Sequence, residues 1–233
     1  MGFSLRRWLL ATLTRRELGI QQLDWKYLRF SYSQFAEDLI AESLLPQATG
    51  FYVDVGAYHP VQISNTYRFY RKGWRGVVVD ANPRCLEEFA RRRPRDIRVH
   101  AVVSDTERDA VFEIHKAGVS SRLQSAGEGH PGEEGSPPEV VERVKIRTRT
   151  LESVLREFVP PGTGVDLLNV DCEHEDLAVL RSNDWTCYQP KVIVAEDWQT
   201  PGRQNQLQQL LEPLGYTLCV AVQVSRVFVK TAG

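Results

Sequence analysis

Acidic residues close two of the apolar runs in this 233-residue chain. Asp171 is the last residue of the run 165–171, Glu196 is the last of the run 191–196, and Asp197 follows it. If both runs are neighbouring strands, these carboxylates meet at one edge of a sheet, where their mutual repulsion requires a partner. Mg²⁺ prefers carboxylate oxygens and water as ligands. We therefore expect these three acids to bind Mg²⁺; the alternative is that they cap helices or pair with cations of the chain.

The same edge offers a base that could deprotonate a hydroxyl group. Asp171 is the first choice, and a metal ion bound there would also lower the pKa of a substrate hydroxyl. His174 and His59 follow the fourth and first predicted strands, and they are alternatives because an imidazole titrates near neutral pH. A lone histidine in a loop is more often an ordinary surface residue, so both histidines are hypotheses.

A single glycine, Gly56, follows the first predicted strand at residues 50–55. In parallel α/β sheets ligands bind beyond the carboxyl ends of the strands, and a glycine there lets the backbone approach a ligand closely. A dinucleotide site would carry G-x-G-x-x-G, and Pro60 lacks an N–H that could face a pyrophosphate. The turn therefore argues against NAD. It leaves room for a nucleoside cofactor without phosphates, such as S-adenosylmethionine.

Two further strand ends could hold the adenosine of such a cofactor. Asp80 closes the second predicted strand, where a carboxylate can accept hydrogen bonds from both ribose hydroxyls. Alternatively Asp80 caps the helix that starts near Pro83, a role that Asn82 could equally fill. Ser104 and Asp105 follow the third predicted strand, where the adenine edge would lie, although Ser-Asp is also common in turns.

Short β-branched runs alternate with helical patterns from residue 50 onward, which predicts an α/β fold with a doubly wound, mostly parallel sheet. The last two runs, 216–222 and 226–230, are too close for a helix between them and predict an antiparallel hairpin at one sheet edge. A Rossmann-like sheet that ends in such a hairpin is typical of class I methyltransferases. The expected strands are 50–55, 76–80, 97–103, 165–171 and 191–196, and the expected helices are 65–72, 83–92, 175–182 and 204–211.

Composition places the chain among ordinary globular proteins, with 42% hydrophobic and 25% charged residues. The formal net charge of -1 supplies no basic field, so no nucleic-acid partner is expected. Four cysteines without a C-x-x-C pair indicate free thiols in a reducing compartment, and we expect a cytoplasmic protein. Oligomeric state is not predicted.

We expect two parts along the chain. Residues 1–30 form a basic helical extension, and residues 31–233 form a single domain with a flexible loop at about 116–140. No apolar run reaches the roughly 18 residues that a spanning helix needs. A basic amphipathic extension can make peripheral contact with an anionic membrane, and the alternative is a solvated helix packed on the domain.

Short motifs follow one another in a fixed order over roughly residues 31–200, and together they resemble the FkbM family of S-adenosylmethionine-dependent methyltransferases. The ordered set is more specific than any one motif. The motifs are Ser33-Gln34-x-x-Glu37-Asp38, the stretch 50–57 (GFYVDVGA), Ser64-Asn65-Thr66, Gly73-Trp74-x-Gly76, Asp80-x-Asn82-Pro83, Arg149-Thr150-Leu151-Glu152-Ser153, the stretch 167–173, and Asp176-Leu177-x-Val179-Leu180.

The resemblance implies a class I methyltransferase fold, S-adenosylmethionine as cofactor, and O-methylation of a hydroxyl on a sugar, polyketide or related small metabolite. The family commonly has glycine where this sequence has His174, which is the one departure. Cofactor contacts carry over to Ser33, Gln34, Glu37, Asp54, Gly56, Ala57, Asn65, Thr66, Asp80, Asn82 and Ser104.

Two other functions stay open at this point. One is an NAD-dependent oxidoreductase, against which the single-glycine turn and the terminal hairpin both count. The other is a binding module that keeps the fold without catalysis.

Overall fold

The computed structural model of the chain describes residues 27–115, 122–123, 139–197 and 206–231. The chain divides into two compact units, Met1–Phe30 and Ser31–Gly233, and the architecture below is that of the second. The expected basic helix and most of the expected loop at 116–140 lie outside the described residues, so membrane contact through the N-terminus stays a prediction. None of the helices within the described ranges has the length and apolar content to cross a membrane.

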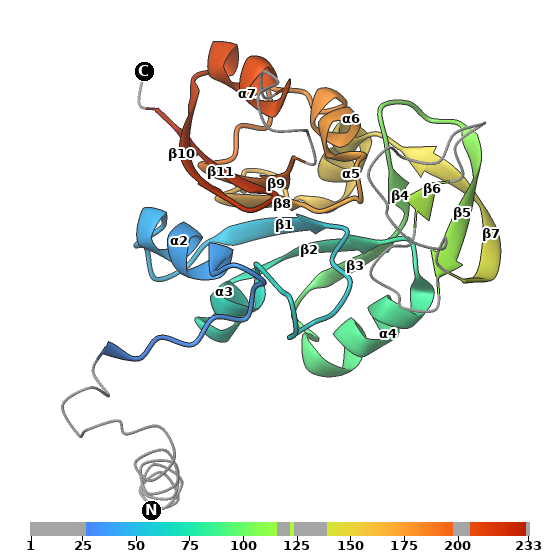
Figure 1. Cartoon of the computed structure of the whole chain (residues 1–233), viewed down its shortest axis with the longest axis horizontal. Helices are drawn as coiled ribbons and strands as arrows, with labels where there is room; N and C mark the ends of the chain where they lie inside the picture. Colours follow the sequence, from blue (N-terminus) through green and yellow to red (C-terminus); the bar gives the residue numbers. More distant parts are fainter. Residues whose placement is uncertain (1–26, 116–121, 124–138, 198–205, 232–233) are drawn as a thin grey trace, which may run out of the picture. The chain divides into compact units, whose positions relative to one another are not determined.

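A seven-stranded sheet forms the centre of the fold, in the order β10-β11-β9-β8-β1-β2-β3 (Figure 1). Strands β3, β2, β1, β8 and β9 pair in parallel, whereas β11 is antiparallel to both β9 and β10. This confirms the predicted doubly wound sheet with a terminal hairpin. The bounds are β1 Phe51–Val55, β2 Arg75–Asp80, β3 Ile97–His100, β8 Leu167–Val170, β9 Val192–Glu196, β10 Tyr216–Val222 and β11 Ser225–Lys230.

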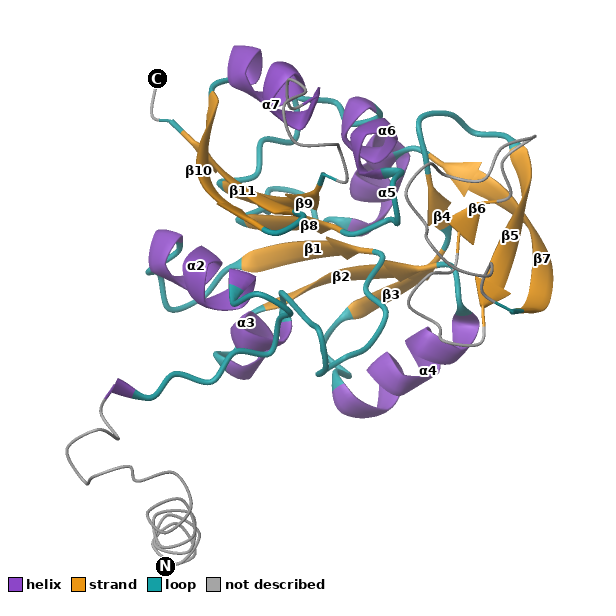
Figure 2. Cartoon of the chain, in the orientation of Figure 1, coloured by secondary structure: helices purple, strands orange, loops and turns teal. Residues whose placement is uncertain are grey.

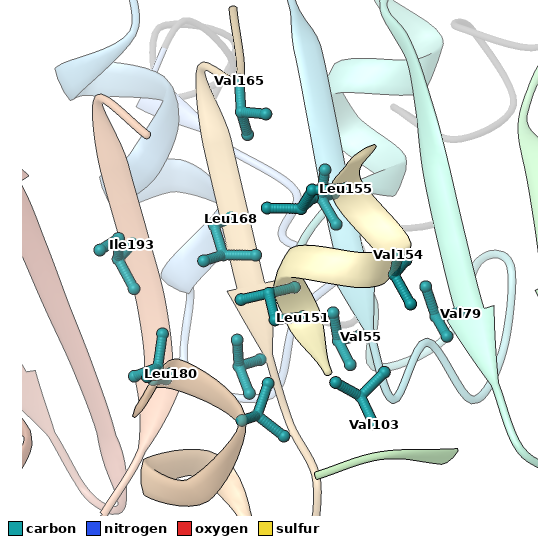
Figure 3. Packing of buried hydrophobic residues seen from close by; sticks show 14 of the residues in the cluster. Val55, Val79, Val103, Leu151, Val154, Leu155, Val165, Leu168, Leu180 and Ile193 are labelled. Atoms are coloured by element: carbon teal, nitrogen blue, oxygen red, sulfur yellow. The ribbon is translucent and has the colours of Figure 1, made fainter. Parts of the chain in front are cut away.

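Helices cover both faces of this sheet (Figure 2). Helices α2 to α4 pack on Tyr52 and Val78, and α5 to α7 pack on the alternate strand residues such as Val53 and Val55. Figure 3 shows Leu151 and other α5 side chains lying over the second of these faces. The bounds are α2 Glu37–Leu44, α3 Tyr67–Arg71, α4 Pro83–Arg92, α5 Leu151–Phe158, α6 Asp176–Arg181 and α7 Gln206–Leu211, with a 3-10 turn at Glu212–Leu214.

A second, four-stranded sheet was not predicted; its order is β4-β7-β5-β6. The expected third strand, 97–103, divides at Ala101 into β3 and β4. The apolar side chains of β5 pack against Ala81, just beyond the end of β2. Strand β7 turns one face toward this cluster, and the side chains on its other face are largely exposed. Strands with one exposed face lack the continuous apolar run by which the central strands were recognised. The bounds are β4 Val102–Val103, β5 Asp109–His115, β6 Arg122–Leu123 and β7 Val140–Arg149.

A fully buried arginine, Arg93, follows the last residue of α4. Its Nε donates to Asp96 Oδ2 at 2.7 Å, and its Nη1 and Nη2 both donate to Thr66 Oγ1 at 3.0 Å. The guanidinium also lies over the rings of Tyr52 and Phe89, 5.3 and 4.9 Å from their centroids. A buried cation is tolerated only with such complete pairing, so these contacts fix α4 against the loop that contains Thr66.

Replacing Arg93 by methionine should lower the free energy of unfolding by about 3–5 kcal/mol, because Asp96 would be left in the interior without its counter-charge. Arg92→Met is the matched control. The side chain of Arg92 is 57% exposed and lies 3.6 Å from Glu88, so its loss should cost less than about 1 kcal/mol. Urea unfolding measures the free energy of unfolding of both variants. Equal losses would show that the buried Arg93–Asp96 pair stabilises the protein no more than the exposed pair does.

Candidate functional site

The glycine turn after β1 lies against the end of β8. Gly56 has a φ of +77°, and a Cβ built on it would lie 1.8 Å from the carbonyl oxygen of Asp171. The backbone N–H groups of Gly56 and Ala57 donate to Val79 O at 3.0 and 3.1 Å. The end of β8 therefore requires glycine here, and the expected approach of a ligand to this turn stays a prediction.

Asp80, at the end of β2, joins this turn to the start of α4. Its Oδ2 accepts a hydrogen bond from Tyr58 N at 2.8 Å, and its Oδ1 accepts one from Asn82 N at 2.7 Å. Burial raises the pKa of Asp80 to about 6, although the two N–H groups act in the opposite direction. Each carboxylate oxygen keeps a lone pair that could accept a ligand hydroxyl.

Three other residues that are predicted to contact the cofactor form hydrogen bonds or ion pairs within the protein. The side-chain oxygen of Asn82 accepts from Arg84 N at 3.0 Å and caps α4, which was the alternative role for this position. Ser104 is fully buried, with its hydroxyl 3.4 Å from Glu175 Oε2 and 3.3 Å from Asp105 Oδ1. Asp105 also pairs with Arg108 at 3.2 Å. A role for Ser104 and Asp105 at the adenine edge stays a prediction.

Asp54, two residues before Gly56, is fully buried and accepts hydrogen bonds from two other side chains, and its direct contact with a cofactor stays a prediction. The Thr66 hydroxyl donates to its Oδ2 in a short hydrogen bond, and Asn169 Nδ2 donates to its Oδ1 at 2.9 Å. Burial raises the pKa of Asp54, whereas Arg93 lowers it. Thr66 is buried in the same group of contacts. Asn65 is partly exposed and donates from Nδ2 to Asn169 Oδ1 at 2.8 Å.

Residues at and just before the start of α2 are hydrogen-bonded within the protein, and the cofactor roles that the resemblance implies for Ser33, Gln34 and Glu37 stay predictions. Glu37 is buried, and its two oxygens accept from Phe35 N and from the Ser225 hydroxyl, each at 2.7 Å, so it ties α2 to β11. Gln34 is exposed. Asp38, which was quoted in the motif without a role, is fully buried and accepts hydrogen bonds from the hydroxyl of Ser31 and that of Ser33, from Tyr32 N and from Arg68 Nε.

Acidic residues do gather at the ends of β8 and β9. Burial, followed by Glu196 and Asp176, raises the pKa of Asp171 well above its ordinary value. Asp176 is fully buried and joins the two strand ends: its Oδ1 accepts from Glu196 N at 3.0 Å and its Oδ2 from Cys172 N at 3.3 Å. Burial raises the pKa of Asp176 to about 8. The sequence analysis quotes Asp176 in a motif without a role of its own, because an acid in the first turn of a helix is common.

The predicted Mg²⁺ set receives no support. No three His, Cys, Asp or Glu groups among the described residues are placed to hold a metal ion. Asp197 instead lies 3.8 Å from Arg226 Nε. What the structure does contain is a pocket of about 190 Å³ beside the end of β9, lined by His174, Asp176, Leu177, Glu196, Asp197, Gln206 and Leu207.

The two candidate histidines differ in what they can do. His59 Nδ1 accepts from Val61 N at 3.1 Å and from Gln62 N at 2.9 Å. Its neutral ring must then carry the proton on Nε2, so no lone pair is left for a base, and this arrangement does not fit the predicted role. His174 lines the pocket and has a φ of +79°, a conformation that favours glycine. Its catalytic role stays a prediction.

Comparison with known proteins gives two findings. The family described as "Methyltransferase FkbM domain" matches residues 54–218, a stretch that begins in β1 and ends in β10. "Methyltransferase sdnD" of Sordaria araneosa is 32% identical over 83 residues, which cover 33% of this chain and 32% of that protein. The aligned segment thus spans about a third of the relative's length.

Gly56→Ala should destabilise the protein by about 2–5 kcal/mol, because the added Cβ meets a backbone carbonyl and the positive φ disfavours alanine. Gly162 is the matched control: its φ is +74°, and a Cβ there meets nothing within 4 Å. Gly162→Ala should therefore cost only about 1–2 kcal/mol. Thermal unfolding compares the two variants. If the Gly56 variant is as stable as its control, the close contact with the end of β8 does not require glycine at this position.

Proposed function

Since this chain belongs to the FkbM methyltransferase family, we propose that it binds S-adenosylmethionine and transfers the methyl group to a hydroxyl oxygen of a small molecule such as a sugar or a polyketide. The observation that carries the proposal is the carboxylate of Asp80 at the carboxyl end of β2. It is held by two backbone N–H groups and retains lone pairs for the two ribose hydroxyls.

The order of the strands supports a direction for the cofactor across the sheet edge. Strand β1 lies between β2, which ends in Asp80, and β8, which is followed by Asp171. A cofactor whose ribose binds Asp80 would extend over the Gly56 turn toward β8. Its sulfonium would then lie near Asp171, and a bound cation and the ionised form of that carboxylate would stabilise each other.

In the proposed reaction, the acceptor oxygen attacks the methyl carbon in line with the sulfur. A C–O bond forms while the C–S bond breaks, and the bonding electron pair leaves with sulfur to give the neutral thioether of S-adenosylhomocysteine. The proton of the acceptor hydroxyl passes to a base, for which Asp171 is the first candidate, because burial and the neighbouring acids Glu196 and Asp176 raise its pKa and so strengthen it as a proton acceptor. The pocket beside β9 would hold the acceptor.

Binding of S-adenosylhomocysteine should depend on the ionisation of Asp80. Because burial raises its pKa to about 6, lowering the pH below 6 protonates the carboxylate and removes acceptors for the ribose, so affinity should fall by up to about tenfold per pH unit. Above that pH the affinity should be constant. Isothermal titration between pH 5 and 8 measures this.

Asp80→Asn should weaken the same binding at pH 8 by about 1.5–3 kcal/mol and abolish the pH dependence. The outcome that contradicts the ribose site is an Asp80 variant with unchanged affinity. Wild-type protein that binds S-adenosylhomocysteine equally at pH 5 and pH 8 would contradict it as well.

Asp171→Asn should leave the affinity for S-adenosylhomocysteine within about threefold and abolish methyl transfer, because an amide cannot take the proton of the acceptor. The assay follows transfer from methyl-labelled S-adenosylmethionine to a panel of sugars and polyketide alcohols. Asp184→Asn, which alters a surface acid, is the control and should keep full activity. Full activity of the Asp171 variant would exclude it as the base.

A further inference from the structure

A series of hydrogen bonds with a single direction begins at Arg93. An arginine side chain has donors and no acceptor. Thr66 Oγ1 receives two of those donors, each at 3.0 Å, so its own hydroxyl hydrogen must point elsewhere. It is donated to Asp54 Oδ2. The orientation of the Thr66 hydroxyl is therefore set by Arg93.

The direction continues through two amides. Asp54 Oδ1 accepts from Asn169 Nδ2 at 2.9 Å, which turns Asn169 Oδ1 toward Asn65. Asn65 Nδ2 donates to that oxygen at 2.8 Å. If the Asn169 amide were reversed, its oxygen would face a carboxylate oxygen and its NH₂ would face the NH₂ of Asn65. Both contacts would be unfavourable, so the orientation of both amides is fixed.

Asn65 is left with one acceptor, its Oδ1, to which none of the described residues donates a hydrogen bond. The position of Asn65 in the fold determines which part of a ligand this oxygen can contact. Asp54 and Asn169 are register partners, each one residue before the end of its strand. Asn65 therefore lies where β1 and β8 end side by side, across β1 from the Asp80 carboxylate on β2.

We infer that Asn65 Oδ1 accepts a hydrogen bond from the α-ammonium group of the methionine part of the cofactor, and that Asn169 is the positioning residue that presents this oxygen. The inference rests on the proposed function. With the ribose at Asp80 and the methyl group delivered beside β8, the amino-acid part of the cofactor occupies the neighbourhood of Asn65. An ammonium has only donors, so it requires an acceptor of this kind.

Two ligands separate this role from a structural one. S-adenosylhomocysteine carries the ammonium group, whereas 5′-methylthioadenosine has the same adenosine and thioether without the amino acid. Asn65→Ala should weaken the first by about tenfold and leave the second within about twofold, as measured by isothermal titration. Asn169→Ala should show the same selectivity with a smaller loss, because the Asn65 amide is then free to turn.

Asp80→Asn is the matched control and should weaken both ligands alike, since both contain the ribose. A thermal scan of the Asn65 variant, together with its retained affinity for methylthioadenosine, reports that it is folded. Equal loss of both ligands in Asn65→Ala, or loss of neither, overturns this inference and leaves the proposed function standing. Wild-type protein that binds neither ligand overturns both.

Discussion

The buried charge of Arg93 holds together the loops and strand ends around the candidate site. A cation with no exposure is tolerated only when every donor is satisfied, and here its partners come from the loop before α3 and from the loop between α4 and β3. Thr66 donates a hydrogen bond to Asp54, and Asp54 accepts another from Asn169. This series of hydrogen bonds therefore connects the end of α4 with β1 and β8. These hydrogen bonds tie the three elements together at the edge where the cofactor is proposed to bind.

Above this buried layer, the backbone at the strand ends is held in uncommon conformations. The turn at Gly56 fits against β8 only without a side chain, and Glu173 and His174 both have positive φ values after β8. Such conformations persist where the surroundings over-determine them, and they are concentrated at functional sites. Asp176 adds a second tie between β8 and β9. These contacts hold the strand ends that carry Asp80 and Asp171, as the proposed catalysis by orientation requires.

Sequence reasoning predicted the central sheet because its strands are buried on both faces, and it predicted α4 because Asn82 and Pro83 mark a helix start. It failed where burial rather than residue type decides the role. In the sequence, Arg93 cannot be told from its exposed neighbours, and the resemblance that assigns Asp54 to the cofactor does not show that its side chain is buried. The predicted magnesium set receives no support among the described residues, since proximity of acids along strand ends does not make their oxygens converge. The second sheet was missed because its strands are exposed on one face.

We propose that the edge formed by β2, β1 and β8 binds S-adenosylmethionine in one direction. A crystal structure of the complex with S-adenosylhomocysteine would show that direction. We expect both ribose hydroxyls within hydrogen-bond distance of the Asp80 carboxylate, and the ammonium group against Asn65 Oδ1. A cofactor bound in the opposite direction, with its ribose away from Asp80, would contradict it.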